Sequence, residues 1–301
     1  MIIDCHTHVW ESVEQLGQGM ALWDTRTRQG SAASPPTARA EEHLAATPPA
    51  DKAIVLGLRS RYLNAHVPNE YISGYVRRHA DRLIGFAGID PTNPKEALRD
   101  LRRAHDELGL LGITLWPAGQ DFHPACSSAM SLYAEAQRLG MPVMVHQDVQ
   151  VSPASKMEFA RPFLLDEVAR EFPALKIIIS QLGYPWIDEA VALLTKHQNV
   201  FADISGLLHH PWRAYNALVT AYQAGVMDAL LFGSNYPFTS AAACIESLYS
   251  INHFCHGTNL PNIPREQLRR IVERNALELL GLDAHLPSRP DREKTTIHLD
   301  D

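Results

Sequence analysis

The chain has 301 residues, of which 27 are Lys or Arg and 34 are Asp or Glu, and its formal net charge is −7. Because both signs are mixed along the chain and no basic block occurs, a nucleic-acid partner is not expected. No apolar run approaches the roughly 18 residues that a membrane span needs, and the four cysteines show no C-x-x-C spacing. We therefore expect a soluble, cytoplasmic protein with reduced thiols and no membrane partner.

Short apolar runs alternate with helical segments over most of the chain. The runs expected to form strands are residues 2–9, 52–58, 83–90, 112–117, 142–146, 175–181, 199–205 and 228–235. The segments expected to form helices are residues 37–46, 69–79, 94–108, 128–139, 161–172, 186–197, 211–225 and a last helix that begins at Pro264. This alternation predicts an α/β fold, a single (β/α)8 TIM barrel, in preference to an open doubly wound sheet.

The barrel is expected to occupy residues 1–285 as one domain, followed by a polar tail at residues 286–301. A long insertion follows the first strand at about residues 11–50. Trp23 in that insertion can form part of a lid over a site, although a surface loop fits this glycine- and proline-bearing segment equally well.

The first expected strand carries the sequence His6-Thr-His8. Side chains two residues apart on a strand point to the same face, so the two imidazoles are expected to lie together. Neutral histidine nitrogens bind zinc and similar divalent ions. A lone His-x-His pattern fits one imidazole at a strand end and one at the surface equally well, so the other strands have to decide.

In a TIM barrel the carboxyl ends of the strands and the loops after them form the active site. Three further expected strands end in polar side chains, at His146, Gln181 and Asn235. This distribution favours a divalent metal on His6, His8 and His146 over histidines that only pack in the core.

Three residues near other strand ends are candidates for substrate binding. Arg59 and Arg61 follow the second strand and can hold a substrate carboxylate through paired hydrogen bonds, although solvated loop arginines fit as well. Trp116 ends the fourth strand, where it can form an apolar wall for a planar ring or simply pack.

The chain resembles the amidohydrolase superfamily and, within it, the amidohydrolase-2 group, which includes aminocarboxymuconate-semialdehyde decarboxylase and related ring decarboxylases and lactonases. The resemblance covers about residues 2–282. The motifs that carry it are Ile3-Asp-Cys-His-Thr-His8, Gly85-Phe-Ala-Gly-Ile-Asp-Pro91, Val143-Met-Val-His146, Gln181-Leu-Gly-Tyr-Pro-Trp186, Leu231-Phe-Gly-Ser-Asn-Tyr-Pro237 and Arg274-Asn-Ala-Leu-Glu-Leu-Leu-Gly281. The resemblance implies a metal on His6, His8 and His146, a strand-six residue that acts on substrate or water, and a strand-eight residue that both ligates the metal and takes a proton.

The chain departs from the family pattern at two positions. It has Gln181 where the family has His on strand six, and Asn235 where the family has Asp on strand eight. A carboxamide oxygen still binds metals, but it carries no charge, and neither amide accepts a proton as a base. We therefore expect Asn235 as an uncharged fourth ligand, Gln181 as a hydrogen-bonding residue, and weakened metal binding.

Because the strand-eight residue Asn235 cannot accept a proton, a residue at another strand end is needed as the base. Asp148 follows the fifth strand, Asp90 ends the third, Asp203 lies within the seventh, and His209 and His210 come after it. Each also has a structural explanation, as a turn residue, a brace of the barrel or an exposed loop residue. Asp148 and His209 are the catalytic candidates that we retain.

The expected function is that of a hydrolase acting on a small carboxylated or cyclic substrate, with zinc, or else manganese, on the histidine cluster. Non-oxidative decarboxylation of a carboxylated ring is the alternative reaction. Because Gln181 and Asn235 replace both proton-carrying residues, a metal-free lactonase-like hydrolase and a catalytically dead ligand-binding barrel stay open as well. The expected partner is a small-molecule substrate, and a homodimer would agree with the exposed helices of a barrel.

Overall fold

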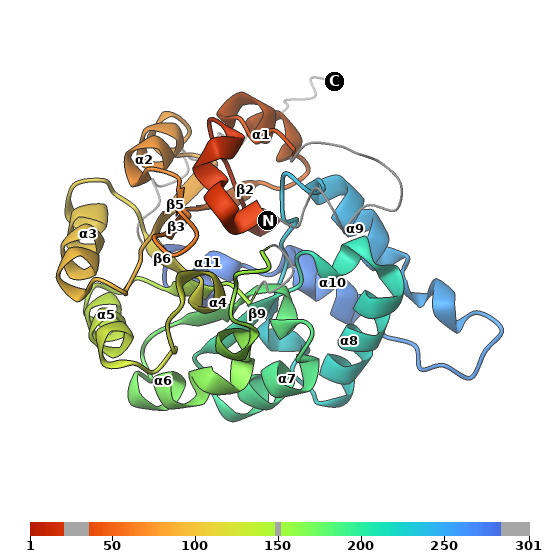
Figure 1. The fold of residues 1–301 in the computed structure, drawn as a ribbon. Helices are drawn as coiled ribbons and strands as arrows, with labels where there is room; N and C mark the ends of the chain where they lie inside the picture. Colours follow the sequence, from red (N-terminus) through yellow and green to blue (C-terminus); the bar gives the residue numbers. More distant parts are fainter. Residues whose placement is uncertain (21–35, 148–151, 284–301) are drawn as a thin grey trace, which may run out of the picture.

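Eight parallel strands form one sheet that nearly closes into a barrel (Figure 1). The computed structural model describes residues 1–20, 36–147 and 152–283. In their order around the sheet the strands are β1 (Ile3–Thr7), β2 (Lys52–Leu56), β5 (Leu83–Gly88), β6 (Gly112–Leu115), β7 (Val143–Val145), β8 (Ile177–Ile179), β9 (Val200–Asp203) and β10 (Leu230–Leu231). All neighbouring pairs in this order are parallel, so the predicted TIM barrel is confirmed.

The chain after β10 continues beside β1 and bridges the remaining gap between the first and last strands of the sheet. The amide of Asn235 donates to the carbonyl of His6 at 2.9 Å, and the amide of His8 donates to the carbonyl of Tyr236 at 3.0 Å. The last barrel strand therefore runs beside the first well beyond the two residues of β10. This pairing brings Asn235 next to the histidine-bearing end of β1.

Helices surround the barrel because each offers an apolar face to the outside of the sheet (Figure 1). The helices on the outside are α1 (Ala40–Ala46), α2 (Asn69–Arg78), α3 (Pro94–Asp106), α5 (Ser127–Arg138), α6 (Asp166–Glu171), α7 (Ile187–Lys196), α8 (Pro211–Gln223), α9 (Ala241–Tyr249) and α10 (Arg265–Glu273). In α3, for example, Ala97, Leu101 and Ala104 are buried on one face. No helix within the described ranges is long and apolar enough to cross a membrane.

Short elements lie between and beyond these helices. They are the hairpin strands β3 (Arg59–Ser60) and β4 (Ala65–His66), the helices α4 (Pro117–Gln120) and α11 (Ala276–Leu279), and the 3-10 helices η1 (Val13–Met20), η2 (Met157–Ala160), η3 (Pro162–Leu165), η4 (Ser180–Gly183), η5 (Leu207–His209), η6 (Met227–Ala229) and η7 (Ile251–Cys255). The hairpin β3 and β4 lies in the loop after β2, where η1 packs against it.

The interior of the barrel is filled with apolar side chains rather than open. Ile3, Ile54 and Phe86 belong to this inner cluster, and Leu277 and Leu280 at α11 pack against it. Because Ile3 is the first residue of β1 and α11 contacts this strand, α11 closes the amino-terminal end of the barrel. Polar chemistry is therefore confined to the carboxyl end of the strands.

Several predicted boundaries are wrong, each for a local reason. The fourth barrel strand ends at Leu115 because Pro117, which has no amide hydrogen, begins α4 instead of extending the strand. The single helix expected at residues 161–172 is instead η3 followed by α6. Extended backbone at Arg274 divides the expected last helix into α10 and α11. The hairpin of β3 and β4 and the helix α9 were not predicted.

Glu135 of α5 ties two outer helices together. Its carboxylate accepts hydrogen bonds from Arg102 of α3 at 2.7 Å and from Arg138 of α5 at 2.9 Å. Hydrogen bonds from Arg138 and then Arg102 lower the pKa of Glu135 from 4.5 to about 2. Because the pKa is lower in the folded state, these contacts add stability that is complete above about pH 4.5 and is lost as the pH falls toward 2.

We expect Glu135→Gln to reduce the free energy of unfolding by about 1–2 kcal/mol at pH 7, the lower figure allowing for the exposure of both arginines. At pH 3 much of this difference should disappear, because wild-type protein has itself lost part of the stabilisation. Thermal melts at the two pH values measure the effect, and Glu171→Gln at an exposed site of α6 is the matched control. A loss of equal size at pH 3 and pH 7 would contradict this account.

Candidate metal centre

Three histidines meet at the carboxyl end of the barrel strands. His6 lies in β1, His8 just beyond it, and His146 directly after β7. The ring centroid of His6 is 5.0 Å from those of both other histidines, and the His8 and His146 centroids are 5.3 Å apart. One ligand nitrogen of each ring lies within 4.8 Å of the other two. The structure thus brings together the three residues that the sequence singled out as ligands.

A β-bulge in β1 turns these histidines inward. Between Asp4 and Thr7 the register shifts, so that three residue steps of β1 oppose two steps of β2. Cys5 belongs to the inner cluster of the barrel, and strict alternation would place His6 on the opposite face. The extra residue of the bulge instead lets His6 face the interior, where it meets His146.

Gly233, in the chain after β10, lies next to the side chain of His6. A Cβ atom added at residue 233 would be 2.9 Å from the Cβ of His6 and 3.1 Å from that of Ser205. Such contacts are shorter than ordinary van der Waals distances, so any side chain here has to displace His6 or the neighbouring backbone. Glycine at this position therefore allows β1 and the last strand to approach at the level of the site.

We expect Gly233→Ala to lower the affinity for a divalent ion by about tenfold, because the added methyl group shifts His6 from its place in the cluster. Competition with a chromophoric chelator measures the affinity. Gly74→Ala is the matched control, since an added Cβ there meets no atom within 4 Å. Wild-type affinity in Gly233→Ala would contradict the proposed packing against His6.

Asp203, the last residue of β9, holds the ring of His6. Its Oδ2 lies 2.9 Å from the Nδ1 of His6, and both side chains are fully buried. Its Oδ1 accepts hydrogen bonds from the amides of Gln181 at 3.1 Å and Ser205 at 2.9 Å, and from the Ser205 hydroxyl. Burial by itself would raise the pKa of Asp203, but attraction to His6 and these hydrogen bonds together hold that pKa below its usual value. The carboxylate is therefore ionised at neutral pH.

The other two imidazoles are neutral. Burial, followed by the neighbouring His6, lowers the pKa of His8 to about 3. Burial, followed by His6 and His8, holds the pKa of His146 well below its ordinary value. Neutral imidazoles keep a lone pair for a metal, so the cluster is ready to bind a cation without first losing protons from these two residues.

This donor set fits a divalent ion of the zinc type. Nitrogen ligands of a tetrahedral ion, with bonds of about 2.05 Å, lie roughly 3.3 Å apart. The Nε2 atoms of His6 and His8 are 3.1 Å apart. Imidazole nitrogens suit zinc, copper, iron and nickel, whereas manganese prefers oxygen ligands.

Gln181 takes part in the site through its main chain. Its backbone is left-handed, with φ 52° and ψ 33°, and Leu182 continues in the same region with φ 48°. This turn directs the Gln181 amide at Asp203. Its side-chain amide lies against Gly206, where an added Cβ would be 2.7 Å from Cδ and Oε1 of Gln181. A role for that side chain in hydrogen bonding to substrate stays a prediction.

Asn235 also has left-handed backbone, with φ 60°. Its amide donates to the His6 carbonyl at 2.9 Å, and its carbonyl accepts from the amide of Phe238 at 3.0 Å. Asn tolerates this conformation better than most residues, and its side chain here is half-buried. The main chain thus places Asn235 beside the cluster, while ligation by its side chain stays a prediction.

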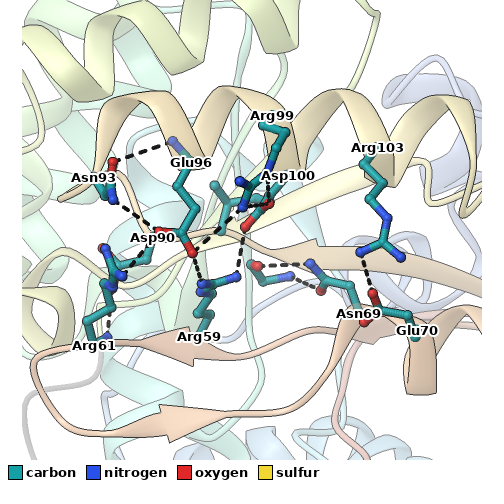
Figure 2. Close-up of polar contacts among 12 residues, drawn as sticks. Arg59, Arg61, Asn69, Glu70, Asp90, Asn93, Glu96, Arg99, Asp100 and Arg103 are labelled. Atoms are coloured by element: carbon teal, nitrogen blue, oxygen red, sulfur yellow. Dashed lines mark hydrogen bonds and ion pairs between the residues drawn. The ribbon is translucent and has the colours of Figure 1, made fainter.

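The two candidate arginines are engaged with helix α3. Figure 2 shows both side chains directed toward that helix, where Arg59 contacts Glu96 and donates to Asp100 at 2.8 Å. Arg61 contacts Glu96 at 3.1 Å. Arg59 is paired with two carboxylates and thereby ties the β3 and β4 hairpin to α3, whereas Arg61 makes one such contact. A role for either arginine in substrate binding stays a prediction.

Two of the four remaining candidates, Trp116 and His209, lie within the described residues. Trp116 is buried, and its ring packs under η1, 3.4 Å from the place that a Cβ at Gly19 would take. His209 is exposed at the end of η5. Asp148 and Trp23 lie outside the described residues.

Asp203 is the site residue that the sequence analysis did not retain, because a brace of the barrel explained its place within the strand. The signal was available in the alternation of β9. Phe201 belongs to the inner cluster, so Asp203, two residues later, faces the interior at the carboxyl end of the strand.

A family model described as amidohydrolase (Amidohydro_2) matches residues 3–282. Among curated proteins, dihydroorotase of Helicobacter pylori strain P12 is 30% identical over 125 residues, which cover 39% of this chain and 35% of that protein. The match thus spans about a third of the length of this curated relative.

Solved structures share the fold at low sequence identity. An uncharacterized TIM-barrel protein from Bordetella bronchiseptica has a TM-score of 0.71 and 22% identity, over 93% of this chain and 98% of that one. A dihydroxybenzoic acid decarboxylase from Polaromonas sp. JS666, with bound manganese, has a TM-score of 0.64 and 16% identity, over 93% and 97%. A probable 2-pyrone-4,6-dicarboxylic acid hydrolase from Acinetobacter baumannii has a TM-score of 0.63 and 16% identity, over 93% and 99%.

Proposed function

Because this chain belongs to the amidohydrolase family described by Amidohydro_2, we propose that it is a hydrolase of a small carboxylated or cyclic molecule that uses a divalent metal. The ligands are His6, His8 and His146, and zinc is favoured over manganese. The observation that carries the proposal is the meeting of these three imidazoles at the carboxyl end of the barrel strands.

An ion of this kind, when bound, polarises the bond to be broken and lowers the pKa of bound water. The residues of the chain prepare the site for it. Asp203 orients the ring of His6, and the half-buried side chain of Asn235 offers a neutral oxygen or a hydrogen-bond donor beside it. Both oxygens of Asp203 already accept hydrogen bonds, so Asp203 is not a free base. Asp148 and His209 are the proposed proton acceptors.

Decarboxylation of a carboxylated ring is the second candidate. This reaction replaces the carboxylate on the ring carbon by a proton and releases carbon dioxide, so it consumes no water and needs no base to activate one, which agrees with the neutral side chain at Asn235. The Polaromonas decarboxylase, similar in fold to this chain, gives the same reaction a precedent on this barrel. The two reactions differ in their products, since only decarboxylation releases carbon dioxide.

The first test is the metal content per chain, measured by plasma mass spectrometry on untagged, unchelated protein with and without added zinc or manganese. The same preparations are then incubated with lactones, cyclic amides and carboxylated phenols. About one ion per chain with ring opening is the expected result, and carbon dioxide release instead would select the second candidate. An empty site would overturn the metal proposal: ring opening would then indicate a metal-free hydrolase, and no reaction a ligand-binding barrel.

A further inference from the structure

The buried carboxylate of Asp203 contacts the ring of His6, one of the proposed metal ligands, at the nitrogen that is not directed at His8. The Oδ2 of Asp203 lies 2.9 Å from the Nδ1 of His6, and on the other side of the ring the Nε2 of His6 lies 3.1 Å from the Nε2 of His8. The imidazole of His6 therefore lies between the carboxylate of Asp203 and the imidazole of His8. Asp203 is joined to the site through this ring.

The two oxygens of Asp203 have different partners. Three donors converge on Oδ1, namely the amide of Gln181, the amide of Ser205 and the hydroxyl of Ser205. An ionised carboxylate only accepts hydrogen bonds, so the Nδ1 of His6, which faces Oδ2, has to carry a proton. In the neutral ring, Nε2 is then the atom that keeps a lone pair for a metal.

One of the three donors on Oδ1, the amide of Gln181, comes from a locally unusual backbone. Gln181 and Leu182 are both left-handed, and this turn directs the Gln181 amide at the carboxylate. Residue 181 thus donates a main-chain hydrogen bond to Asp203, and this bond does not depend on the identity of its side chain.

We propose that Asp203 is the positioning residue of the metal centre: it fixes the tautomer and the orientation of His6 and supplies, through that ring, the negative charge that Asn235 does not provide. The inference rests on the proposed function, because the ion is the one assigned to His6, His8 and His146. Carboxylates behind ligand histidines make the imidazole a stronger donor and hold it in place.

The convergence of donors on Oδ1 makes Asp203→Asn a sharp test. The amide oxygen of asparagine is the only acceptor able to satisfy those donors, so its NH2 group has to face the Nδ1 of His6. His6 then accepts at Nδ1 and carries its proton on Nε2, the atom that the metal needs. We expect zinc affinity to fall 10–100-fold.

The tautomer is measured in the metal-free protein by nitrogen NMR of labelled histidine side chains, with His6 assigned from its loss in His6→Gln. Wild-type protein should show a protonated Nδ1 at His6, and Asp203→Asn an unprotonated one. Ser205→Ala is the matched control, because it removes a donor from Oδ1 but keeps the bond between Oδ2 and His6. It should leave the tautomer unchanged and zinc affinity within about threefold of wild type.

The outcomes separate the two proposals. An unprotonated Nδ1 in wild-type protein would overturn the inference even if Asp203→Asn fails to fold. A folded Asp203→Asn protein with wild-type zinc affinity would overturn it as well. A wild-type chain that takes up no zinc would instead overturn the proposed function, while the protonation of Nδ1 would still report whether Asp203 orients His6.

Discussion

Replacing His6 and His8 together by alanine should abolish the uptake of a divalent ion. Both side chains contribute a nitrogen to the cluster, so the substitution removes two of its three imidazoles and leaves His146 alone. A single imidazole does not hold a zinc ion against a chelator or buffer, because tight sites need three or four protein ligands. Any metal-dependent turnover should disappear with the ion, and plasma mass spectrometry measures the loss directly.

The chain offers a matched control for this double substitution. His253 and His256 are also close in sequence, with ring centroids 5.4 Å apart, but both are exposed and lie outside the barrel in and after η7. Replacing these two histidines by alanine should leave one ion per chain. Stoichiometric metal retained after the loss of His6 and His8 would show that the ion binds elsewhere, and the assignment of the site would be wrong.

The ligand histidines could be predicted because they depend on local sequence and on a general property of the fold. Each follows an apolar run, and parallel barrel strands all present their carboxyl ends to the same side. The bulge in β1 could not be predicted, since it arises from pairing with β2 and leaves no mark in the alternation of β1 itself. His6 faces the interior because of a contact between distant segments.

The partners of the candidate arginines, in contrast, could not be predicted. Arg59 and Arg61 have the right chemistry at the right end of the barrel, but α3 presents Glu96 and Asp100 to the same loop (Figure 2). Glu96 and Asp100 lie 37 and 41 residues after Arg59 in the sequence. Alternation and residue type place a side chain at a strand end, whereas its partner is decided by packing between elements.

The contribution of Gln181 depends on backbone conformation in the same way. A glutamine after an apolar strand indicates a polar side chain near the site, but no pattern reveals that the residue is left-handed and directs its amide at Asp203. The prediction of the sixth strand through residue 181 was therefore too long, because β8 ends at Ile179 and the turn follows.

Asn235→Asp should tighten the binding of zinc or manganese by roughly 10–100-fold, because it places a negative charge beside a dication in a partly buried site. The substitution adds no bulk, and Asp tolerates the left-handed backbone at residue 235 about as well as Asn. The main-chain hydrogen bonds to His6 and from Phe238 do not involve the side chain and should persist. Isothermal titration with each metal, or chelator competition where binding is too tight, measures the change.

The control has to show that a gain in affinity comes from the site and not from the net charge of the protein. Asn216→Asp adds the same charge at an exposed position of α8. This variant should bind metal with wild-type affinity. If Asp203 supplies the charge that strand eight lacks, Asn235→Asp should also recover part of the affinity lost in Asp203→Asn, because both carboxylates then act on one ion. An affinity for Asn235→Asp equal to that of wild type would mean that the side chain at residue 235 does not face the metal. Within the described part of the site, the negative charge that balances the metal ion would then come from Asp203.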